Sequence, residues 1–257
     1  MPLMRQRERF ERIDVPTPSA FRNMVAAGVL VGVVLSCLLL WSLLWRKANQ
    51  MNWLNDDTLY DALYDQLSPT EPNGGRVWSD SNFSNVQLFI VDDIHAENPQ
   101  LQAVQIFVRN VDTNEMTIVD VPVNAKVWLS EGVSYLPAQF ELGGAAVALP
   151  PLTNATNVHV SHVIVATDRI WDQLSSFEGP TTKALLSSQT RDFYTINSDF
   201  STGELIKFGE MIQEVGVENI AHIEAPYWED TLADGTEVSV VDWQELPTVL
   251  GIFTYPE

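Results

Sequence analysis

The sequence predicts an α/β fold, with a single mixed sheet covered by helices on both faces and preceded by one transmembrane helix. Two observations predict it. Residues 24–45 form an uncharged apolar run, and beyond residue 86 short apolar runs alternate with segments of helical periodicity. Strands that are apolar on both faces indicate a sheet buried on both sides. We therefore expect a tail (1–23), a transmembrane helix (24–45), a stalk helix with a linker (46–75) and a folded domain (76–257).

The apolar run 24–45 is long enough to cross a membrane. At about 1.5 Å per residue, such a helix spans the roughly 30 Å hydrocarbon core. The run ends in Trp41, Trp45, Arg46 and Lys47, a pattern typical of a membrane interface and not of a cleaved signal peptide. Because the short tail is rich in arginine, we expect it to stay in the cytoplasm. The chain is thus predicted to be a single-pass protein of the cell membrane with an extracellular domain.

Charged residues are distributed unevenly along the chain, and the change falls at the end of the apolar run. Of its 14 basic and 34 acidic residues, seven basic and three acidic ones lie up to Lys47, which leaves a net charge of −24 beyond it. Such a field excludes nucleic acid as a partner and favours cations or a basic protein, although it also serves simply to keep a domain soluble. The one cysteine, Cys37, lies in the apolar run. The domain is therefore expected to have no disulfide and to depend on its core.

The strands are predicted from apolar runs bounded by turn residues. A short helix capped at residues 55–57 precedes them, and the stretch 68–75 is predicted to be a linker. The runs 104–108 and 116–122 form a hairpin around the turn 112–115. The strands are predicted at 86–91, 104–108, 116–122 and 158–166, with closing strands at 220–225 and 237–241 joined around Asp234 and Gly235.

The helices are predicted from their caps and their periodicity. A helix over 139–149 is expected to stop at Pro150 and Pro151. A second helix, 169–177, is capped by Asp168 and closed by Gly179. The third begins at a capping box formed by Ser201 and Glu204 and ends at Gly216.

Three clusters are candidates for a site. Asp92 and Asp93 end a strand and are followed by His95 and Glu97, so they either hold Mg²⁺ or Ca²⁺ or form a solvated loop. His159 and His162 are three residues apart on a predicted strand and point to opposite faces, which argues against a shared metal. The stretch 227–230, Tyr-Trp-Glu-Asp, is either an exposed aromatic and acidic patch that stacks on sugar rings or a loop with a partly buried tryptophan.

The order of these elements resembles the extracellular domain of the LytR-CpsA-Psr family over nearly all of 86–250. The hairpin 101–122 is similar to the family's hairpin, and 135–144 (YLPAQFELGG) is similar to its helix start "KINAAYAYGG". The stretch 158–168 resembles its strand "PIDHYVVVNFD", and 195–226 resembles its late helix and strand. The resemblance implies an outer α/β/α domain. It also implies transfer of glycopolymers from polyprenyl-pyrophosphate carriers to peptidoglycan, with a largely apolar pocket where we expect Tyr135 and Phe140.

The sequence differs from the family at positions where the family has charged residues. The Arg-x-Asp positions are Gln100 and Gln102, and the Arg-Asp pair after the hairpin is Val123 and Asn124. The family's lysine falls on Tyr135, and its Arg-rich segment after the second helix is absent. A pyrophosphate needs fixed cations and a carboxylate-bound metal, and neutral amides do not replace them. We therefore expect no catalytic residues and no cofactor, with Mg²⁺ as the alternative.

Three functions follow from these observations. The first is a non-catalytic, membrane-anchored envelope protein that binds a glycopolymer or polyprenyl lipid, or modulates an active relative. The second is an active phosphotransferase whose charges come from other positions, such as Arg109, Lys126 and Asp93. The third is a structural component that docks a basic protein partner through its acidic surface.

Overall fold

The computed structural model describes residues 20–50, 56–175 and 195–256. The chain separates into two compact units, Met1–Gln50 and Met51–Glu257. The predicted tail falls almost entirely outside the described residues. So do the end of the helix predicted at 169–177 and its closing residue Gly179.

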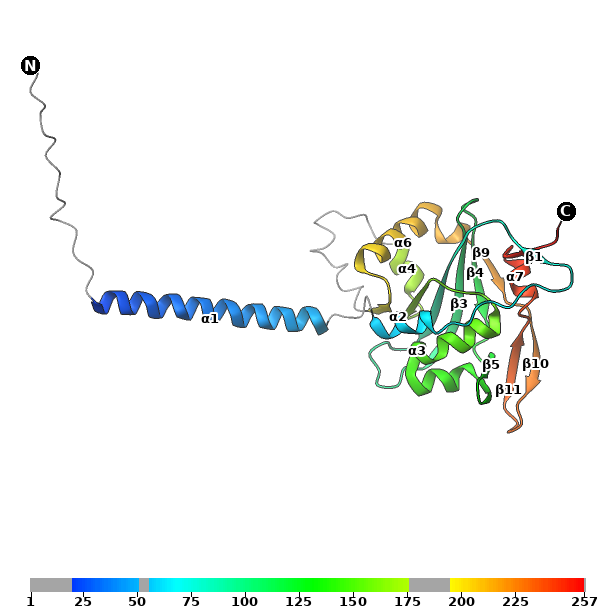
Figure 1. Ribbon diagram of the computed structural model, residues 1–257, viewed down its shortest axis with the longest axis horizontal. Coiled ribbons are helices and arrows are strands. Elements are labelled where there is room, and N and C mark those ends of the chain that lie inside the picture. Colours follow the sequence, from blue (N-terminus) through cyan, green and yellow to red (C-terminus); the bar gives the residue numbers. More distant parts are fainter. Residues whose placement is uncertain (1–19, 51–55, 176–194, 257) are drawn as a thin grey trace, which may run out of the picture. The chain divides into compact units, whose positions relative to one another are not determined.

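The first unit contains α1 (Ala20–Gln50), a helix that includes the apolar run 24–45 (Figure 1). Its described side chains, at 24–25 and 27–42, are all exposed. Within the described part of the chain, no helix is long and apolar enough to cross a membrane. The transmembrane role of 24–45 therefore stays a prediction.

The second unit is built from strands interleaved with helices (Figure 1). Its elements in chain order are α2 (Asp57–Tyr64), β1 (Val77–Trp78), β2 (Phe83–Val91), β3 (Leu101–Asn110), β4 (Met116–Val121), β5 (Lys126–Leu129), β6 (Gly132–Tyr135), α3 (Leu136–Thr156), β7 (His162–Ala166), α4 (Ile170–Ser175), β8 (Ile196–Ser198), α6 (Thr202–Val215), the 3-10 helix η2 (Val217–Asn219), β9 (Ala221–Glu224), β10 (Tyr227–Thr231), β11 (Glu237–Val241), α7 (Glu245–Val249) and β12 (Phe253–Thr254).

The central sheet has six strands in the order β8-β7-β2-β3-β4-β9. Strands β2, β3 and β4 form an antiparallel meander, while β7 runs parallel to β2 and β9 runs parallel to β4. The sheet is therefore mixed, as predicted. The predicted hairpin between β3 and β4 is confirmed, and in its register Val104 lies opposite Val121. Within the described residues, two-stranded ribbons β1-β12, β5-β6 and β10-β11 accompany the sheet.

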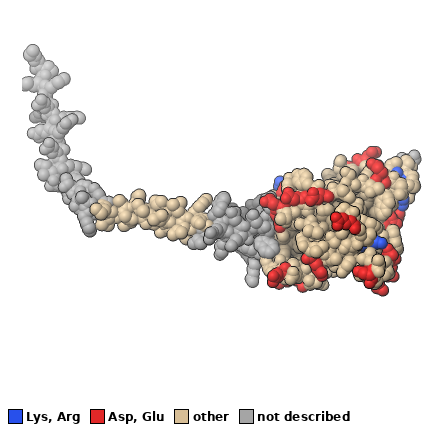
Figure 2. All heavy atoms as spheres, turned by 60° about the horizontal axis from the view of Figure 1, so that its bottom comes forward, with Lys and Arg blue, Asp and Glu red and all other residues tan. Residues whose placement is uncertain are grey.

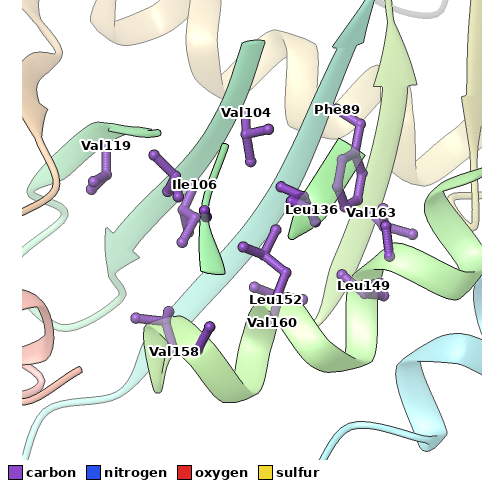
Figure 3. Packing of buried hydrophobic residues seen from close by; sticks show 14 of the residues in the cluster. Phe89, Val104, Ile106, Val119, Leu136, Leu149, Leu152, Val158, Val160 and Val163 are labelled. Atoms are coloured by element: carbon purple, nitrogen blue, oxygen red, sulfur yellow. The ribbon is translucent and has the colours of Figure 1, made fainter. Parts of the chain in front are cut away.

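Each face of the sheet carries its own hydrophobic core, because neighbouring residues of a strand point to opposite sides. Phe89, Ile106 and Val119 pack with Leu149 and Leu152 of α3 on one face, as Figure 3 shows. Helix α2 joins this core through Leu59 and Ala62. On the other face Leu88, Phe107 and Ile118 pack against α4 and α6. Helices on both faces are thus confirmed.

The helix predicted over 139–149, with its end at Pro150, differs from the observed helix α3. The helix begins earlier, at Leu136, and continues through both prolines to Thr156, with a break at Gly143 and Gly144. Each proline removes one backbone hydrogen bond, and this cost is offset by the buried Leu149 and Leu152 on either side. The glycines, and not the prolines, interrupt the helix.

Two strand predictions also need correction. The strand predicted at 158–166 begins only at His162, because the side chain of Gln66 pairs with both the N–H and the carbonyl of Val160 at 3.0 and 2.9 Å. The turn at Asp234 and Gly235 joins β11 to β10, not to β9. The stretch 227–230 is therefore a strand. Tyr227 and Trp228 in it are 48% and 50% exposed, so the predicted loop is wrong and the aromatic side chains are exposed. Their stacking on sugar rings stays a prediction.

Two helix starts are confirmed in atomic detail. The Asp56 carboxylate caps α2 by accepting from the N–H of Thr58 at 2.8 Å. Helix α6 begins at the predicted capping box of Ser201 and Glu204 and ends at Gly216. At both positions a side chain close in sequence supplies the cap, so local sequence indicates where the helix begins.

Candidate functional site

The parallel strands β2 and β7 end side by side at one edge of the sheet. The carboxyl edge of such strands is where α/β proteins most often bind ligands. A cavity of about 660 Å³ opens there between α2, the loop 92–100 and the break in α3. We call it the carboxyl-edge cavity, and its volume falls within the range of small-molecule and cofactor sites.

The walls of the carboxyl-edge cavity are partly apolar. Leu59 of α2, Ile94 of the loop, Phe140 and Ala145 of α3 and Val165 of β7 line it. The ring of Phe140 lies 5.7 Å from that of Phe89, which anchors the wall in the core. An apolar chain inserted here would be in contact with the same cluster that holds the sheet together.

The break in α3 shapes this cavity. Gly144 has φ +66° and ψ −154°, a conformation that is essentially restricted to glycine. A Cβ added at Gly143 would lie 2.4 Å from Cγ2 of Val147. Both glycines line the cavity, so the local sequence that interrupts the helix also opens the site.

The polar part of the lining is acidic or neutral. Asp56, Glu97 and Glu141 contribute carboxylates, and Gln100 and Asn197 contribute amides. The Asn197 Oδ1 atom is buried and has no hydrogen-bond partner among the described residues, so a hydroxyl of a ligand would satisfy it. The described lining residues include no lysine, arginine or histidine. This arrangement suits a neutral or apolar ligand and opposes a phosphate.

The two aspartates predicted as metal ligands close the loop beside the cavity. Asp92 accepts from the N–H groups of Gln100 at 2.8 Å and Asp93 at 2.7 Å. These bonds, that from Gln100 first, lower the pKa of the Asp92 carboxyl. Asp93 accepts from the N–H of His95 at 2.9 Å. Within the described part of the chain, no three His, Cys, Asp or Glu side chains are arranged to hold a metal. The geometry thus gives both residues a structural role in the turn.

The family-equivalent positions are only partly brought together. Gln100 lines the carboxyl-edge cavity, whereas Gln102, Val123 and Asn124 do not. Asn124 instead accepts from the Ser239 hydroxyl at 3.0 Å and so ties the end of β4 to β11. Tyr135 occupies the N-cap position of α3 without capping it through its side chain. Of the two residues predicted for a ligand pocket, Phe140 lines the cavity and Tyr135 does not.

Two basic side chains of the domain, Arg76 and Lys126, are engaged with carboxylates. Lys126 pairs with Asp230 at 2.7 Å and lies 6.0 Å from the centre of the Trp128 ring. This hydrogen bond lowers the pKa of Asp230. Arg76 pairs with Glu245 at 2.7 Å. Figure 2 shows acidic residues spread over the visible face of the domain with few basic ones among them.

Some residues that line the carboxyl-edge cavity were not predicted from sequence motifs. Glu141 and Asn197 carry no local pattern, and Asp56 was assigned only as a helix cap. The Gly143-Gly144 pair was the sequence feature that could have indicated this cavity, because two adjacent glycines inside a helical pattern indicate a break or a close approach.

His159 and His162, considered above as a metal-binding pair, are separate in the structure. His162 bonds to Asp199, while His159 is exposed.

No family model matches the sequence, and no curated protein matches it either. Solved structures with a similar fold include proteins of the LytR-CpsA-Psr family, which the sequence resembles. TagV of Bacillus subtilis is 7% identical with a TM-score of 0.49, and the match covers 67% of this chain and 96% of that one. TagT bound to LI-WTA is 12% identical with a TM-score of 0.47, over 72% and 96% of the two chains. With TM-scores below 0.5 and identities this low, neither similarity assigns a function to this chain or a role to any of its residues.

Proposed function

We propose that this protein is a membrane-anchored component of a cell envelope that binds a polyprenyl lipid or a neutral stretch of an envelope glycopolymer without transferring it. The carboxyl-edge cavity carries this proposal. Its apolar walls, its unpaired Asn197 acceptor and its three carboxylates favour chains and hydroxyls over phosphates.

The charge of the lining argues against phosphoryl transfer. Such a reaction needs cations that neutralise the charge developing on the phosphoryl oxygens. Gln100 stands where the resemblance implies a charged residue, and Glu97 and Glu141 would repel a pyrophosphate. Lys126 is held by Asp230 and would have to break that pair to contribute. Binding without transfer is the simplest function that fits these residues.

Anchoring by residues 24–45 completes the proposal. Most described side chains of α1 are apolar, and large ones such as Leu30, Leu35 and Leu39 are exposed. Exposed apolar surface of this extent needs a cover, and the flanking tryptophans and the arginine-rich tail favour a bilayer with the N-terminus in the cytoplasm. Expression in a membrane followed by alkaline extraction tests this part, because a peripheral protein would be released and an anchored one retained.

Ligand choice is the sharpest test of the cavity. The purified full chain is titrated with a polyprenol and with the matching polyprenyl phosphate, and complexes are counted by native mass spectrometry. We expect the polyprenol to bind at least as tightly, because the added phosphate meets carboxylates. A clear preference for the phosphate would contradict the proposal.

A matched pair of variants locates the bound lipid. Ala146 lines the cavity, whereas its neighbour Val147 is exposed and does not. Ala146→Phe is expected to fill the cavity and weaken lipid binding at least tenfold, and Val147→Phe is expected to leave it within twofold. Equal loss in both variants would place the lipid elsewhere.

A further inference from the structure

A second cavity lies at the opposite end of the sheet from the first. It has a volume of about 470 Å³ and lies on the face covered by α6, near the amino ends of β2 and β7. We call it the amino-edge cavity. Ser84 near the start of β2 and His162 at the start of β7 line it, together with Phe200 and Phe208. It is therefore separate from the carboxyl-edge cavity and independent of the function proposed for that site.

The imidazole of His162 is held in one orientation. Its Nδ1 lies 2.6 Å from Oδ2 of Asp199, whose side chain is only 4% exposed. Asp199 also accepts from the N–H of Val163 at 2.7 Å, so the carboxylate itself is fixed. Because Nδ1 is occupied, Nε2 is the nitrogen left to contact a ligand.

An aromatic stack forms the apolar wall beside this histidine. The His162 ring stacks on Phe200 with centroids 4.0 Å apart and planes at 17°. Phe200 in turn stacks on Phe208 at 5.6 Å and 24°. Phe208 meets Phe107 edge to face at 5.2 Å, which ties the stack to the core. The wall is thus rigid, and little ordering would be required of it on binding.

Two cations complete the lining, and neither forms an ion pair. Arg109 uses its Nε to donate to Asn114 at 3.0 Å, and its terminal nitrogens have no partner among the described residues. Lys207 of α6 has no hydrogen-bond partner within the same described ranges. Arg76 and Lys126, in contrast, each pair with a carboxylate at 2.7 Å. Unpaired cations converging on one cavity are unexpected in a domain of such negative charge.

Two acids limit what the cavity can hold. Glu210 and Glu214 also line it, from the same helix as Lys207. Neither forms an ion pair with Arg109 or Lys207 in the described residues. Their charge disfavours a polyanion, whereas a single oxyanion can sit between the cations with an apolar group against the rings.

We propose that the amino-edge cavity binds the oxyanion of a small phosphate monoester or carboxylate, with its apolar part against Phe200 and Phe208. Arg109 and Lys207 supply the charge, and His162 in its imidazolium form donates from Nε2 while Nδ1 donates to Asp199. The arginine fork and the ammonium supply charge-assisted hydrogen bonds, and the buried Asp199 positions the imidazole. The aromatic wall selects an organic anion over the bare ion.

Histidine spectroscopy of the full chain tests this directly. The chain has four histidines, so a ¹³C-histidine-labelled sample gives few imidazole signals, and His162→Asn assigns the relevant one. The probes are phenyl phosphate, benzoate, inorganic phosphate and benzylamine at physiological ionic strength. We expect saturable shifts of the His162 signal with phenyl phosphate or benzoate, weaker ones with inorganic phosphate, and none at His159.

Variants of basic residues distinguish binding by specific side chains of the cavity from general electrostatic attraction to the domain. Arg109→Gln and Lys207→Gln are each expected to raise the Kd for the organic anion about tenfold, through loss of one charge-assisted bond. Arg169→Gln removes an exposed cation outside both cavities and is expected to change the Kd less than twofold. An equal loss in Arg169→Gln, tighter binding of benzylamine, or no saturable shift at His162 would overturn the proposal.

Discussion

The two cavities of this domain lie at opposite ends of one sheet and on opposite faces, and they differ in their charged lining. Among the described lining residues, the carboxyl-edge cavity has acids alone, whereas the amino-edge cavity has two basic side chains beside its acids Glu210 and Glu214. The carboxyl-edge cavity has three carboxylates and no cation among its described lining residues. The amino-edge cavity has two unpaired cations and a histidine fixed by a buried carboxylate. The difference shows that the basic side chains of the domain are unevenly distributed. The edge of the sheet where α/β proteins most often bind ligands is the one less suited to a phosphate.

The cavities also differ in the parts of the fold that form their walls. The carboxyl-edge cavity is walled in part by an exposed loop closed by Asp92 and by a glycine break in α3. The amino-edge cavity is walled in part by the core aromatics Phe200 and Phe208, and the buried Asp199 holds its histidine in place. Changes in the second should therefore affect stability, and changes in the first should affect ligand choice. The predictions below follow that contrast, from the largest effect to the smallest.

Removing the buried carboxylate should have the largest effect. Asp199→Ala leaves the Val163 N–H and His162 Nδ1 without their acceptor, and we expect the free energy of unfolding to fall by about 3 kcal/mol. Chemical denaturation measures it. Asp92→Ala, at the exposed loop, is the matched change near the other cavity, and we expect it to lower the free energy of unfolding clearly less. Equal costs would remove the contrast between a core-built and a loop-built cavity.

Reducing the negative charge of the carboxyl-edge cavity should change its ligand preference. The double variant Glu97→Gln with Gln100→Arg removes one carboxylate and adds a cation to the lining. We expect it to improve the affinity for polyprenyl phosphate relative to polyprenol about tenfold, as one charge-assisted bond would. Native mass spectrometry compares the two lipids in parallel. An unchanged ratio would mean that the phosphate does not approach this lining.

The smallest effect is expected at the start of α6, which helps wall the amino-edge cavity. The Ser201 hydroxyl donates to the Glu204 carboxylate at 2.7 Å, and this bond leads the causes that lower the pKa of Glu204. Ser201→Ala should cost about 1 kcal/mol of unfolding free energy. It leaves Glu204 itself in place.

The same variant has a signed pH dependence. A carboxyl with a lowered folded pKa stabilises the fold above its unfolded pKa, about 4.3 for glutamate, and loses that contribution as pH falls through the folded value. The deficit of Ser201→Ala should therefore be full near neutral pH and shrink below about pH 4. A deficit that stays constant to lower pH would show that the cap does not act through the Glu204 charge.

Local features of the fold were predictable from the sequence, and long-range ones were not. The capping box at Ser201 and the hairpin between β3 and β4 depend on neighbouring residues, so their patterns sufficed. The path of α3 through Pro150 was not predictable, because it depends on burial of residues on either side. The strand at 158–166 was shortened by Gln66, which lies far away in the sequence.

The residues of the candidate sites likewise include some that local sequence predicts and some that it does not. Gln100 and Phe140 were predictable because they fall in stretches that resemble a known family, and both line the carboxyl-edge cavity. The pairing of His162 with Asp199 depends on the register of β7 with β8, and no local pattern shows it. Arg109 and Lys207 come from different elements, so only the folded chain brings them to one cavity.

A transfer assay tests the central claim, that the carboxyl-edge cavity binds without transferring. The purified full chain is incubated with a polyprenyl-pyrophosphate-linked glycopolymer and peptidoglycan, with and without Mg²⁺, and release of the polyprenyl phosphate is followed. We predict no release above background in either condition, because the described lining lacks the cations that the reaction needs. Turnover that depends on Mg²⁺ would contradict the account and would assign the acidic lining to a metal.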